Sequence, residues 1–301
     1  MASLRDLTRE EIEEILKTSE LLKLQLLRGQ EHPLLKGKTL GMIFEKPSTR
    51  TRISFEVGMW QLGGYALYLS AGDLQLGRGE TIADTARVLS RYVNGIMARV
   101  FSHQTILDLI EHSTVPVVNG LSDFTHPCQG LADLFTIYEK KGKFSGVRLA
   151  YIGDGNNVAH SLIYGASKVG MDIVLGCPKG YEPNPDVVVE AQGEAGRNGS
   201  SVEVTNDVKE AARGADIVYT DVWTSMGQEK DREKRLNRLK PYQVNAKLVK
   251  EAKEDYIFMH CLPAHRGEEV TDEVADSKNS VIFDQAENRM HTQKALLALI
   301  M

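Results

Sequence analysis

Short apolar runs alternate with helix-like patterns along most of the chain, and this alternation predicts its secondary structure. We expect a first series of strands at residues 39–44, 65–69, 95–100 and 115–119. A second series is expected at residues 147–152, 171–175, 202–205, 215–220, 256–260 and 281–284. The segments between them carry apolar residues at helical spacing. Strands that alternate with helices are typical of parallel sheets, so the sequence predicts an α/β fold with two parallel sheets flanked by helices.

The two series of strands suggest two domains, which also suits a chain of 301 residues. A polar, glycine-bearing stretch, Lys140–Gly146, separates the two series. We therefore place one domain at residues 1–140 and the other at residues 141–286. The last segment, residues 287–301, has a helical pattern and no obvious place in the second sheet. We expect this segment to pack back on the first domain.

The composition argues against several classes of protein. A net charge of -5 with 26% charged residues is not typical of a surface for nucleic acid or an anionic membrane. No apolar run approaches the ~20 residues of a membrane span. The N-terminal residues have the character of neither a signal peptide nor an Arg-rich transit peptide. The cysteines Cys128, Cys177 and Cys261 have no metal-ligand spacing and form no even disulfide framework. We expect a soluble, cytoplasmic protein.

An anion-binding signal lies in the segment Ser48-Thr49-Arg50-Thr51-Arg52, between an apolar strand and a helical pattern. The hydroxyl groups fall at a strand-to-helix turn, among backbone N–H groups that have no partner within the helix. Helix capping alone explains Ser and Thr at this position. It does not explain the two arginines, because cations oppose the helix dipole there. A phosphate or carboxylate between the guanidinium groups and the amides explains both features.

Two further strand ends in the first domain carry polar residues. Arg99 closes an apolar strand, where it either faces a ligand or pairs with a nearby acid. His126-Pro127-Cys128-Gln129 opens a helix after the next strand. His126 and Gln129 could simply satisfy local backbone groups. Together they could also bind a carbonyl oxygen and an amide nitrogen, because glutamine supplies both a donor and an acceptor.

In the second domain, the turn Gly153-Asp154-Gly155-Asn156-Asn157 follows a strand and invites a dinucleotide-binding interpretation. The third glycine position holds Val158, and no acidic residue ends the next strand, so this interpretation is weak. A tight turn that presents Asn157 remains, and its amide suits the head group of an amino acid.

Two other strand ends of the second domain carry reactive groups. Asp221 follows one strand and could partner an ammonium group, and His260-Cys261-Leu262-Pro263 follows another. A Cys beside a His suggests a thiol nucleophile. The dipeptide alone cannot place the imidazole on the sulfur, because neighbouring residues of a strand face opposite ways.

These segments together resemble the aspartate/ornithine carbamoyltransferase family, and specifically its ornithine branch. The turn at Ser48–Arg52, Arg99, His126–Gln129, the loop from Asp221 to Ser225-Met226-Gly227 and His260–Pro263 occur in the family's order over nearly the whole chain. Aspartate-specific members usually show Thr in place of Cys128 and His-Pro-Leu-Pro in place of His260–Pro263. Asp221 would also repel the extra carboxylate of aspartate, whereas it would attract an ammonium group of ornithine.

The resemblance implies two domains joined by two long helices, with carbamoyl phosphate on the first domain and ornithine on the second. The δ-amine of ornithine then attacks the carbamoyl carbon, which gives citrulline and phosphate. The implied contacts of carbamoyl phosphate are Ser48, Thr49, Arg50, Thr51, Gln75, Arg99, His126, Pro127, Cys128, Gln129, Cys261, Leu262 and Arg289. The implied contacts of ornithine are Asn157, Asp221, Ser225 and Met226. Arg99, His126 and Cys261 are the implied catalytic residues, and Cys261 would lie beside the amine rather than act as a covalent nucleophile.

The resemblance also implies a homotrimer, or a multiple of trimers, in which Gln75 completes the neighbouring subunit's phosphate site. It implies no cofactor, no metal, and a place in arginine biosynthesis or, in reverse, in arginine catabolism. Three alternatives stay open. They are a carbamoyltransferase for another amine such as putrescine, a nicotinamide-dependent oxidoreductase, and a binding protein without catalytic activity.

Overall fold

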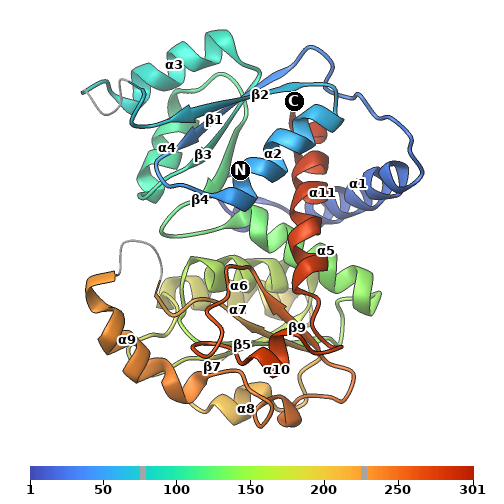
Figure 1. The fold of residues 1–301 in the computed structure, drawn as a ribbon, viewed down its shortest axis with the longest axis vertical. Helices are drawn as coiled ribbons and strands as arrows, with labels where there is room; N and C mark the ends of the chain where they lie inside the picture. Colours follow the sequence, from blue (N-terminus) through green and yellow to red (C-terminus); the bar gives the residue numbers. More distant parts are fainter. Residues whose placement is uncertain (75–78, 225–228) are drawn as a thin grey trace. The chain divides into compact units, whose positions relative to one another are not determined.

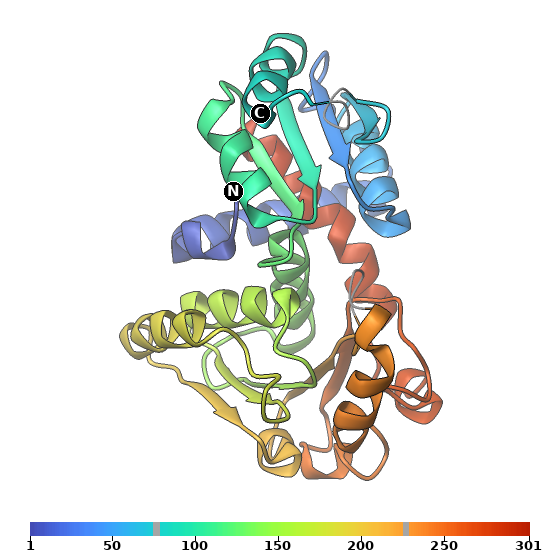
Figure 2. The same cartoon turned by 90° about the vertical axis from the view of Figure 1, so that its left-hand side faces the viewer.

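The computed structural model describes residues 1–74, 79–224 and 229–301, and these residues form two compact units. Unit 1 comprises Met1–Phe135 and Glu287–Met301, and unit 2 comprises Thr136–Ala286 (Figures 1 and 2). The chain crosses the boundary within two continuous helices, α5 (Pro127–Lys141) and α11 (Ile282–Ile300). Unit 1 is therefore built from two stretches that lie at opposite ends of the sequence.

Unit 1 holds a four-stranded parallel sheet in the order β2-β1-β3-β4. Its strands are β1 (Thr39–Phe44), β2 (Tyr65–Ser70), β3 (Gly95–Arg99) and β4 (Val117–Leu121). Its helices, besides parts of α5 and α11, are α1 (Arg9–Leu27), α2 (Thr49–Gln61), α3 (Ile82–Tyr92) and α4 (His103–His112). The chain runs from β1 to one edge and then from β3 to the other. The direction of winding thus reverses between β1 and β3, and ligands bind beyond such a point in open parallel sheets.

Unit 2 holds a five-stranded parallel sheet in the order β7-β6-β5-β8-β9. Its strands are β5 (Arg148–Ile152), β6 (Asp172–Gly176), β7 (Val202–Thr205), β8 (Ile217–Thr220) and β9 (Ile257–His260). Its own helices are α6 (Asn157–Val169), α7 (Pro185–Arg197), α8 (Val208–Ala212), α9 (Arg232–Leu239) and α10 (Asp272–Ala275). Here the reversal falls between β5 and β8. Asn156 and Asn157 follow the first of these strands and Asp221 follows the second.

The fold class predicted from the alternating pattern is confirmed, and nine of the expected strands are present to within about two residues. The strand expected at 281–284 is wrong, because this apolar run forms the start of α11. Only its beginning lies beside the sheet, where the Val281 N–H donates to the Phe258 carbonyl. Ile282 is buried, whereas Phe283 is 71% exposed, which is typical of one side of a helix.

Both chain ends belong to unit 1 and contact the starts of neighbouring strands. The Met1 ammonium donates to the Val117 carbonyl at 2.7 Å, at the first residue of β4. The Met301 side chain packs against Gly95, where a Cβ would lie 3.0 Å from its sulfur, at the first residue of β3. The Met1 carbonyl also accepts from the Asn119 N–H at 3.0 Å, so Met1 lies beside the edge strand β4, whereas Met301 lies at the start of β3.

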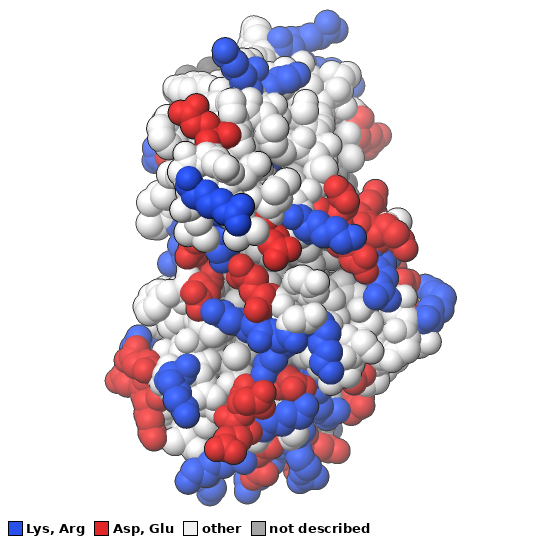
Figure 3. Space-filling model, turned by 90° about the vertical axis from the view of Figure 1, so that its right-hand side faces the viewer, with Lys and Arg blue, Asp and Glu red and all other residues white. Residues whose placement is uncertain are grey.

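The surface of the molecule mixes charges of both signs. On the face drawn in Figure 3, Lys and Arg side chains are interspersed with Asp and Glu side chains. Within the described ranges, none of the helices combines the length and the hydropathy that crossing a bilayer would need.

A buried lysine sits in unit 1 on α11. The Lys294 ammonium donates to Gln61 Oε1 at 2.8 Å and lies 3.1 Å from His32 Nε2. His32 Nδ1 lies 3.2 Å from the Gln30 carbonyl, so its proton resides there and Nε2 is free to accept from the lysine. Both partners of Lys294 are thus neutral, and burial lowers the Lys294 pKa from 10.5 to about 8.

Replacing Lys294 by methionine should stabilise the protein at neutral pH, with a gain that shrinks as the pH rises. The unfolded chain keeps this proton up to about pH 10.5, whereas the folded chain releases it near pH 8. Wild-type stability therefore increases across this interval, and below it the buried charge opposes folding. Thermal unfolding of wild type and Lys294→Met between pH 7 and 10 measures the difference. Lys17→Met, at an exposed lysine, should show a difference that does not change with pH. A pH-independent gain for Lys294→Met would contradict the assignment.

Candidate active site

The turn after β1 places a hydroxyl and two arginines at the N-terminus of α2. Ser48 is the N-cap of this helix, and its Oγ accepts from the Thr51 N–H at 3.2 Å. The first turn of α2 carries no acidic residue that could balance the positive end of the helix dipole. Pro127 is the first residue of α5, the helix that follows β4. Unit 1 thus presents two helix N-termini at the carboxyl ends of its strands, an arrangement that favours an anion.

Thr51 is the centre of a hydrogen-bond chain that joins these two helices to α11. Its hydroxyl oxygen accepts from Arg289 Nη2 at 3.2 Å and lies 3.4 Å from Arg99 Nη1. Arg289 Nη1 donates to Gln129 Oε1 at 2.7 Å, and Gln129 Nε2 donates to Asp133 Oδ1 at 2.8 Å. The structure therefore brings together residues from α2, β3, α5 and α11 that are far apart in the sequence.

The three-arginine cluster, Arg50, Arg99 and Arg289, acts electrostatically on His126. The side chain of His126 is buried, and its pKa lies well below 6.5 because of burial and the positive charges of these three arginines. Its imidazole is therefore neutral at physiological pH, when it can donate one hydrogen bond without adding charge. Such a concentration of positive charge around a neutral donor suits a phosphate dianion attached to a polar acyl group.

The contacts of Arg52 and Cys128 limit what these two side chains of unit 1 can do. Arg52 does not share an anion with Arg50, because its Nε donates to Glu56 at 2.9 Å and its guanidinium stacks on Tyr68. The expectation that Arg52 shares an anion with Arg50 is therefore not supported, and the assignment of Arg50 to a phosphate stays a prediction. The Cys128 thiol donates to the Asn119 carbonyl at 3.4 Å, and burial raises its pKa to about 11. This thiol is therefore no nucleophile.

In unit 2, the turn after β5 is fixed by its glycines and by Asn156. A Cβ on Gly155 would lie 2.2 Å from Pro183 N, so only glycine fits against the backbone of that segment. Asn156 is the N-cap of α6, and its Oδ1 accepts from Val158 N at 2.9 Å and Ala159 N at 3.2 Å. Asn157 is the first residue of α6, adjacent to this cap.

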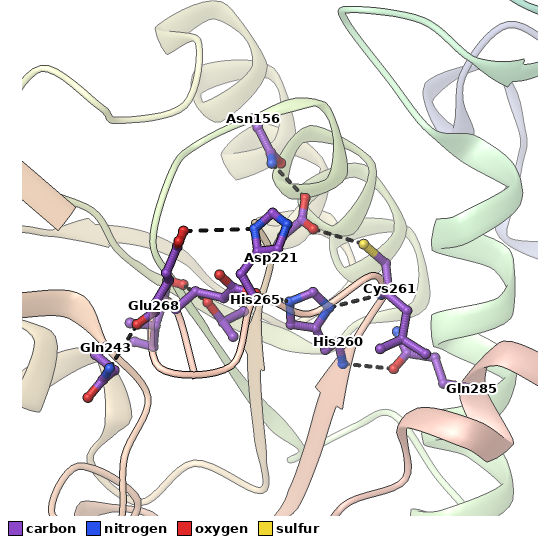
Figure 4. Close-up of polar contacts among 12 residues, drawn as sticks. Asn156, Asp221, Gln243, His260, Cys261, His265, Glu268 and Gln285 are labelled. Atoms are coloured by element: carbon purple, nitrogen blue, oxygen red, sulfur yellow. Dashed lines mark hydrogen bonds and ion pairs between the residues drawn. The ribbon is translucent and has the colours of Figure 1, made fainter. Parts of the chain in front are cut away.

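Asp221 directly follows β8 and accepts hydrogen bonds from two other segments of unit 2 (Figure 4). The Cys261 thiol donates to Asp221 Oδ1 at 2.9 Å, and Asn156 Nδ2 donates to Asp221 Oδ2 at 2.7 Å. A sulfur that donates to a carboxylate carries its proton, and the sulfur beside an anion is not stabilised as a thiolate. The predicted neighbours Asp221 and Cys261 are thus in direct contact, whereas Asn156 was missed as the partner of Asp221.

His260 orients the turn that carries Cys261 and Leu262. The Leu262 N–H donates to His260 Nδ1 at 2.9 Å, so the ring proton resides on Nε2, which lies 3.1 Å from Glu269 Oε1. Both His260 and Glu269 are fully buried. Leu262 has φ = 59°, a left-handed conformation that costs a leucine about 1–3 kcal/mol. Glu269 gave no signal in the sequence, because nothing local links it to His260 nine residues earlier.

Three predicted residues, Gln75, Ser225 and Met226, lie outside the described residues. Within the described part, two groups offer three potential metal-ligand atoms each within 4.8 Å of one another. They are Asp221, His260 and Cys261, and His265, Glu268 and Glu269. Atoms of both groups already take part in the hydrogen bonds above and in an Arg232–Glu268 ion pair.

Nearly the whole chain matches known protein families. Residues 1–139 match the carbamoyl-phosphate-binding domain of aspartate/ornithine carbamoyltransferases, and residues 145–300 match the aspartate/ornithine-binding domain. An ornithine carbamoyltransferase of Thermococcus kodakarensis is 63% identical, over 99% of this chain and 95% of that protein. The anabolic ornithine carbamoyltransferase of Pyrococcus furiosus is 61% identical over the same shares. A solved P. furiosus ornithine carbamoyltransferase, 60% identical, superimposes with a TM-score of 0.98 over 100% of this chain and 96% of that chain.

Proposed function

The chain belongs to the aspartate/ornithine carbamoyltransferase family, and from this premise we propose that it is an ornithine carbamoyltransferase. It converts carbamoyl phosphate and L-ornithine to L-citrulline and phosphate. The observation that carries the proposal is the three-arginine cluster around neutral His126, in the unit that matches the carbamoyl-phosphate-binding domain. The ornithine relatives at 55–63% identity support the choice of amino acid.

Carbamoyl phosphate is bound in unit 1. The phosphate lies at the N-terminus of α2, against Ser48, Thr49, Arg50 and Thr51, where helix amides and a guanidinium neutralise it. Arg99 and His126 donate to the carbamoyl oxygen, on which negative charge develops during attack. Gln129 holds the carbamoyl NH₂ with its amide oxygen. Arg289, already bonded to Thr51 and Gln129, keeps these two groups at a fixed separation.

Ornithine is bound in unit 2, where Asn157 and Asp221 offer an amide and a carboxylate at the reversal between β5 and β8. Asp221 attracts an ammonium group and repels a second carboxylate, which favours ornithine over aspartate. Ser225 and Met226 complete this site by resemblance to the family.

The reaction is a direct transfer in one attack. The lone pair of the neutral δ-amine forms a bond to the carbamoyl carbon, and the bond from that carbon to the phosphate oxygen breaks with its electron pair. The amine loses one proton, which the departing phosphate accepts, as citrulline forms. No oxidant, reductant or covalent enzyme intermediate is needed. Cys261 contributes by contact with Asp221 and the amine, since its thiol is a donor rather than a nucleophile.

Replacing Cys261 by serine should slow the reaction and leave it measurable. A hydroxyl can still donate to Asp221, although serine is smaller than cysteine and shifts the carboxylate contact. A thiol nucleophile would instead be indispensable. Steady-state kinetics of Cys261→Ser, together with mass spectrometry of wild type mixed with carbamoyl phosphate alone, tests this. A carbamoyl adduct on Cys261 would refute direct transfer.

One assay tests the function itself. Purified protein, carbamoyl phosphate and L-ornithine should yield citrulline, and omission of either substrate should abolish it. Putrescine and L-lysine in place of ornithine test for a broader amine acceptor, which Asp221 alone would not exclude. Citrulline formation excludes a purely binding role. Binding of a nicotinamide cofactor without citrulline formation would favour the oxidoreductase alternative.

We further propose a homotrimer, or a multiple of trimers, in which Gln75 serves the neighbouring subunit's phosphate site. Arg50→Gln and Gln75→Ala chains, each nearly inactive at a low carbamoyl phosphate concentration, should then recover activity at that concentration when they are dissociated and reassociated together. In a ring of three with random mixing, about a quarter of the sites keep both residues intact. Mixed trimers that form, as judged by native mass, and remain inactive would refute the shared site.

In the cell we place the enzyme in the cytoplasm and in arginine biosynthesis. The word anabolic in the name of the P. furiosus relative supports the direction toward citrulline. A gene deletion that creates a requirement for arginine or citrulline, but not for ornithine, would test this placement.

A further inference from the structure

The amide of Asn156 has an orientation that its neighbours dictate. Its Oδ1 receives the N–H groups of Val158 and Ala159 and lies 3.2 Å from the Tyr151 hydroxyl, which can donate to it. Backbone N–H groups can only donate, so the amide oxygen must face α6 and the NH₂ group must face away. The direction of the NH₂ group is therefore set by the N-terminus of α6, because the single proton of the Tyr151 hydroxyl has a closer acceptor in the Asp154 carbonyl at 2.9 Å.

That NH₂ group meets Asp221. It donates to Oδ2 at 2.7 Å, while the Cys261 thiol donates to Oδ1 at 2.9 Å from the turn after β9 (Figure 4). Each carboxylate oxygen thus has one donor, and the two donors come from different elements of unit 2. The carboxylate plane is fixed as a result. Both donors are neutral, so neither of them brings a positive charge that would compete with an ammonium group for this carboxylate.

We propose that Asn156 is a positioning residue for ornithine, a role that rests on the proposed function. It does not touch the substrate, but holds the Asp221 carboxylate in the orientation that the ammonium group requires. A cationic residue here would neutralise Asp221, and an apolar residue would leave Oδ2 without its donor. The neutral amide orients the carboxylate without reducing its charge.

Two variants of Asn156 separate positioning from helix capping. Asn156→Asp keeps the cap, because aspartate caps as well as asparagine, but it replaces the donor by an oxygen facing Asp221. Asn156→Ser keeps a cap and removes the donor without adding charge. At saturating carbamoyl phosphate, the KM for ornithine should rise at least tenfold in Asn156→Asp and by a smaller factor in Asn156→Ser. The KM for carbamoyl phosphate should change less than twofold in both.

The pH dependence of the KM for ornithine distinguishes a positioning role of Asn156 from a purely structural one. In Asn156→Asp the two facing carboxyl groups share a proton, so the KM for ornithine should acquire a pH dependence that Asn156→Ser lacks. The matched control is Asn184→Asp, at the N-cap of α7 in the same unit, where Asn184 Oδ1 accepts from Asp186 N. This control should leave both KM values unchanged.

Contrary results are distinct from a failure of the proposed function. Wild-type KM values in both Asn156 variants, or equal increases for both substrates, would overturn the positioning role. A crystal structure of Asn156→Ser with Asp221 in its wild-type orientation would also overturn it, whatever reaction the protein catalyses. Absence of citrulline with the wild-type protein would instead refute the function, and the same crystal structure would still decide the role of Asn156.

Discussion

Replacing Arg50 by glutamine should raise the KM for carbamoyl phosphate roughly 10- to 150-fold, because loss of a charge-assisted hydrogen bond costs about 1.5–3 kcal/mol. Arg50 lies in the first turn of α2. The other arginine of that turn, Arg52, pairs with Glu56 and stacks on Tyr68, so it does not replace the positive charge of Arg50. The KM for ornithine should change little, because ornithine is bound in the other unit. Initial rates with each substrate varied in turn measure both constants.

Arg52→Gln is the matched control for this experiment. It makes the same substitution two residues away, at a guanidinium that already pairs with Glu56 and stacks on Tyr68. An exposed pair of this kind contributes little to stability, so the variant should fold and bind carbamoyl phosphate as wild type does. Near-normal saturation of Arg50→Gln, or an equal loss in Arg52→Gln, would remove the phosphate assignment.

Replacing Asp221 by asparagine should have the largest effect on ornithine. The substitution keeps the size of the side chain and removes the negative charge that attracts the ammonium group. Asn156 and Cys261 each donate to one oxygen of Asp221. In Asp221→Asn one of these oxygens becomes an NH₂ group, which cannot accept, so one of the two hydrogen bonds is lost. The KM for ornithine should therefore rise by more than the tenfold expected for Asn156→Asp, while that for carbamoyl phosphate stays near wild type.

The pH profile completes the Asp221 experiment. The δ-amine resembles a lysine, with a free pKa of about 10.4, and only its neutral form attacks. Wild-type activity should therefore rise with pH from neutrality. Asn184→Asp is again the control, and it should leave both KM values unchanged. Equal losses of saturation for both substrates in Asp221→Asn would contradict the division of the substrates between the units.

The sequence was informative where a site is local. The strand-to-helix turn at Ser48–Arg52 could be predicted from its own segment, because the strand, the turn and the helix are consecutive. Strand positions followed from apolar runs for the same reason. The run at 281–284 misled, because a short apolar stretch fits a strand and a buried helix start equally well. Its pattern changes to helical spacing only after the residues that contact β9.

What the sequence could not supply are contacts between distant segments. In the sequence Arg52 seems equivalent to Arg50. In the structure its guanidinium pairs with Glu56, one helical turn later, and stacks on Tyr68 of β2. Asn156 and Asn157 are adjacent in the sequence, and only the cap geometry decides which of them faces Asp221. The pairing of His260 with Glu269 likewise depends on a turn whose path no local pattern specifies.

Met1 and Met301 both belong to unit 1, so the order of segments in this unit could be changed by circular permutation. Met1 and Met301 contact the first residues of β4 and β3, which are neighbours in the sheet. A short linker between them, with new ends opened in a loop of unit 2, would turn unit 1 into one uninterrupted stretch of chain. In such a circularly permuted chain, Arg289 and Arg50 would belong to one contiguous segment.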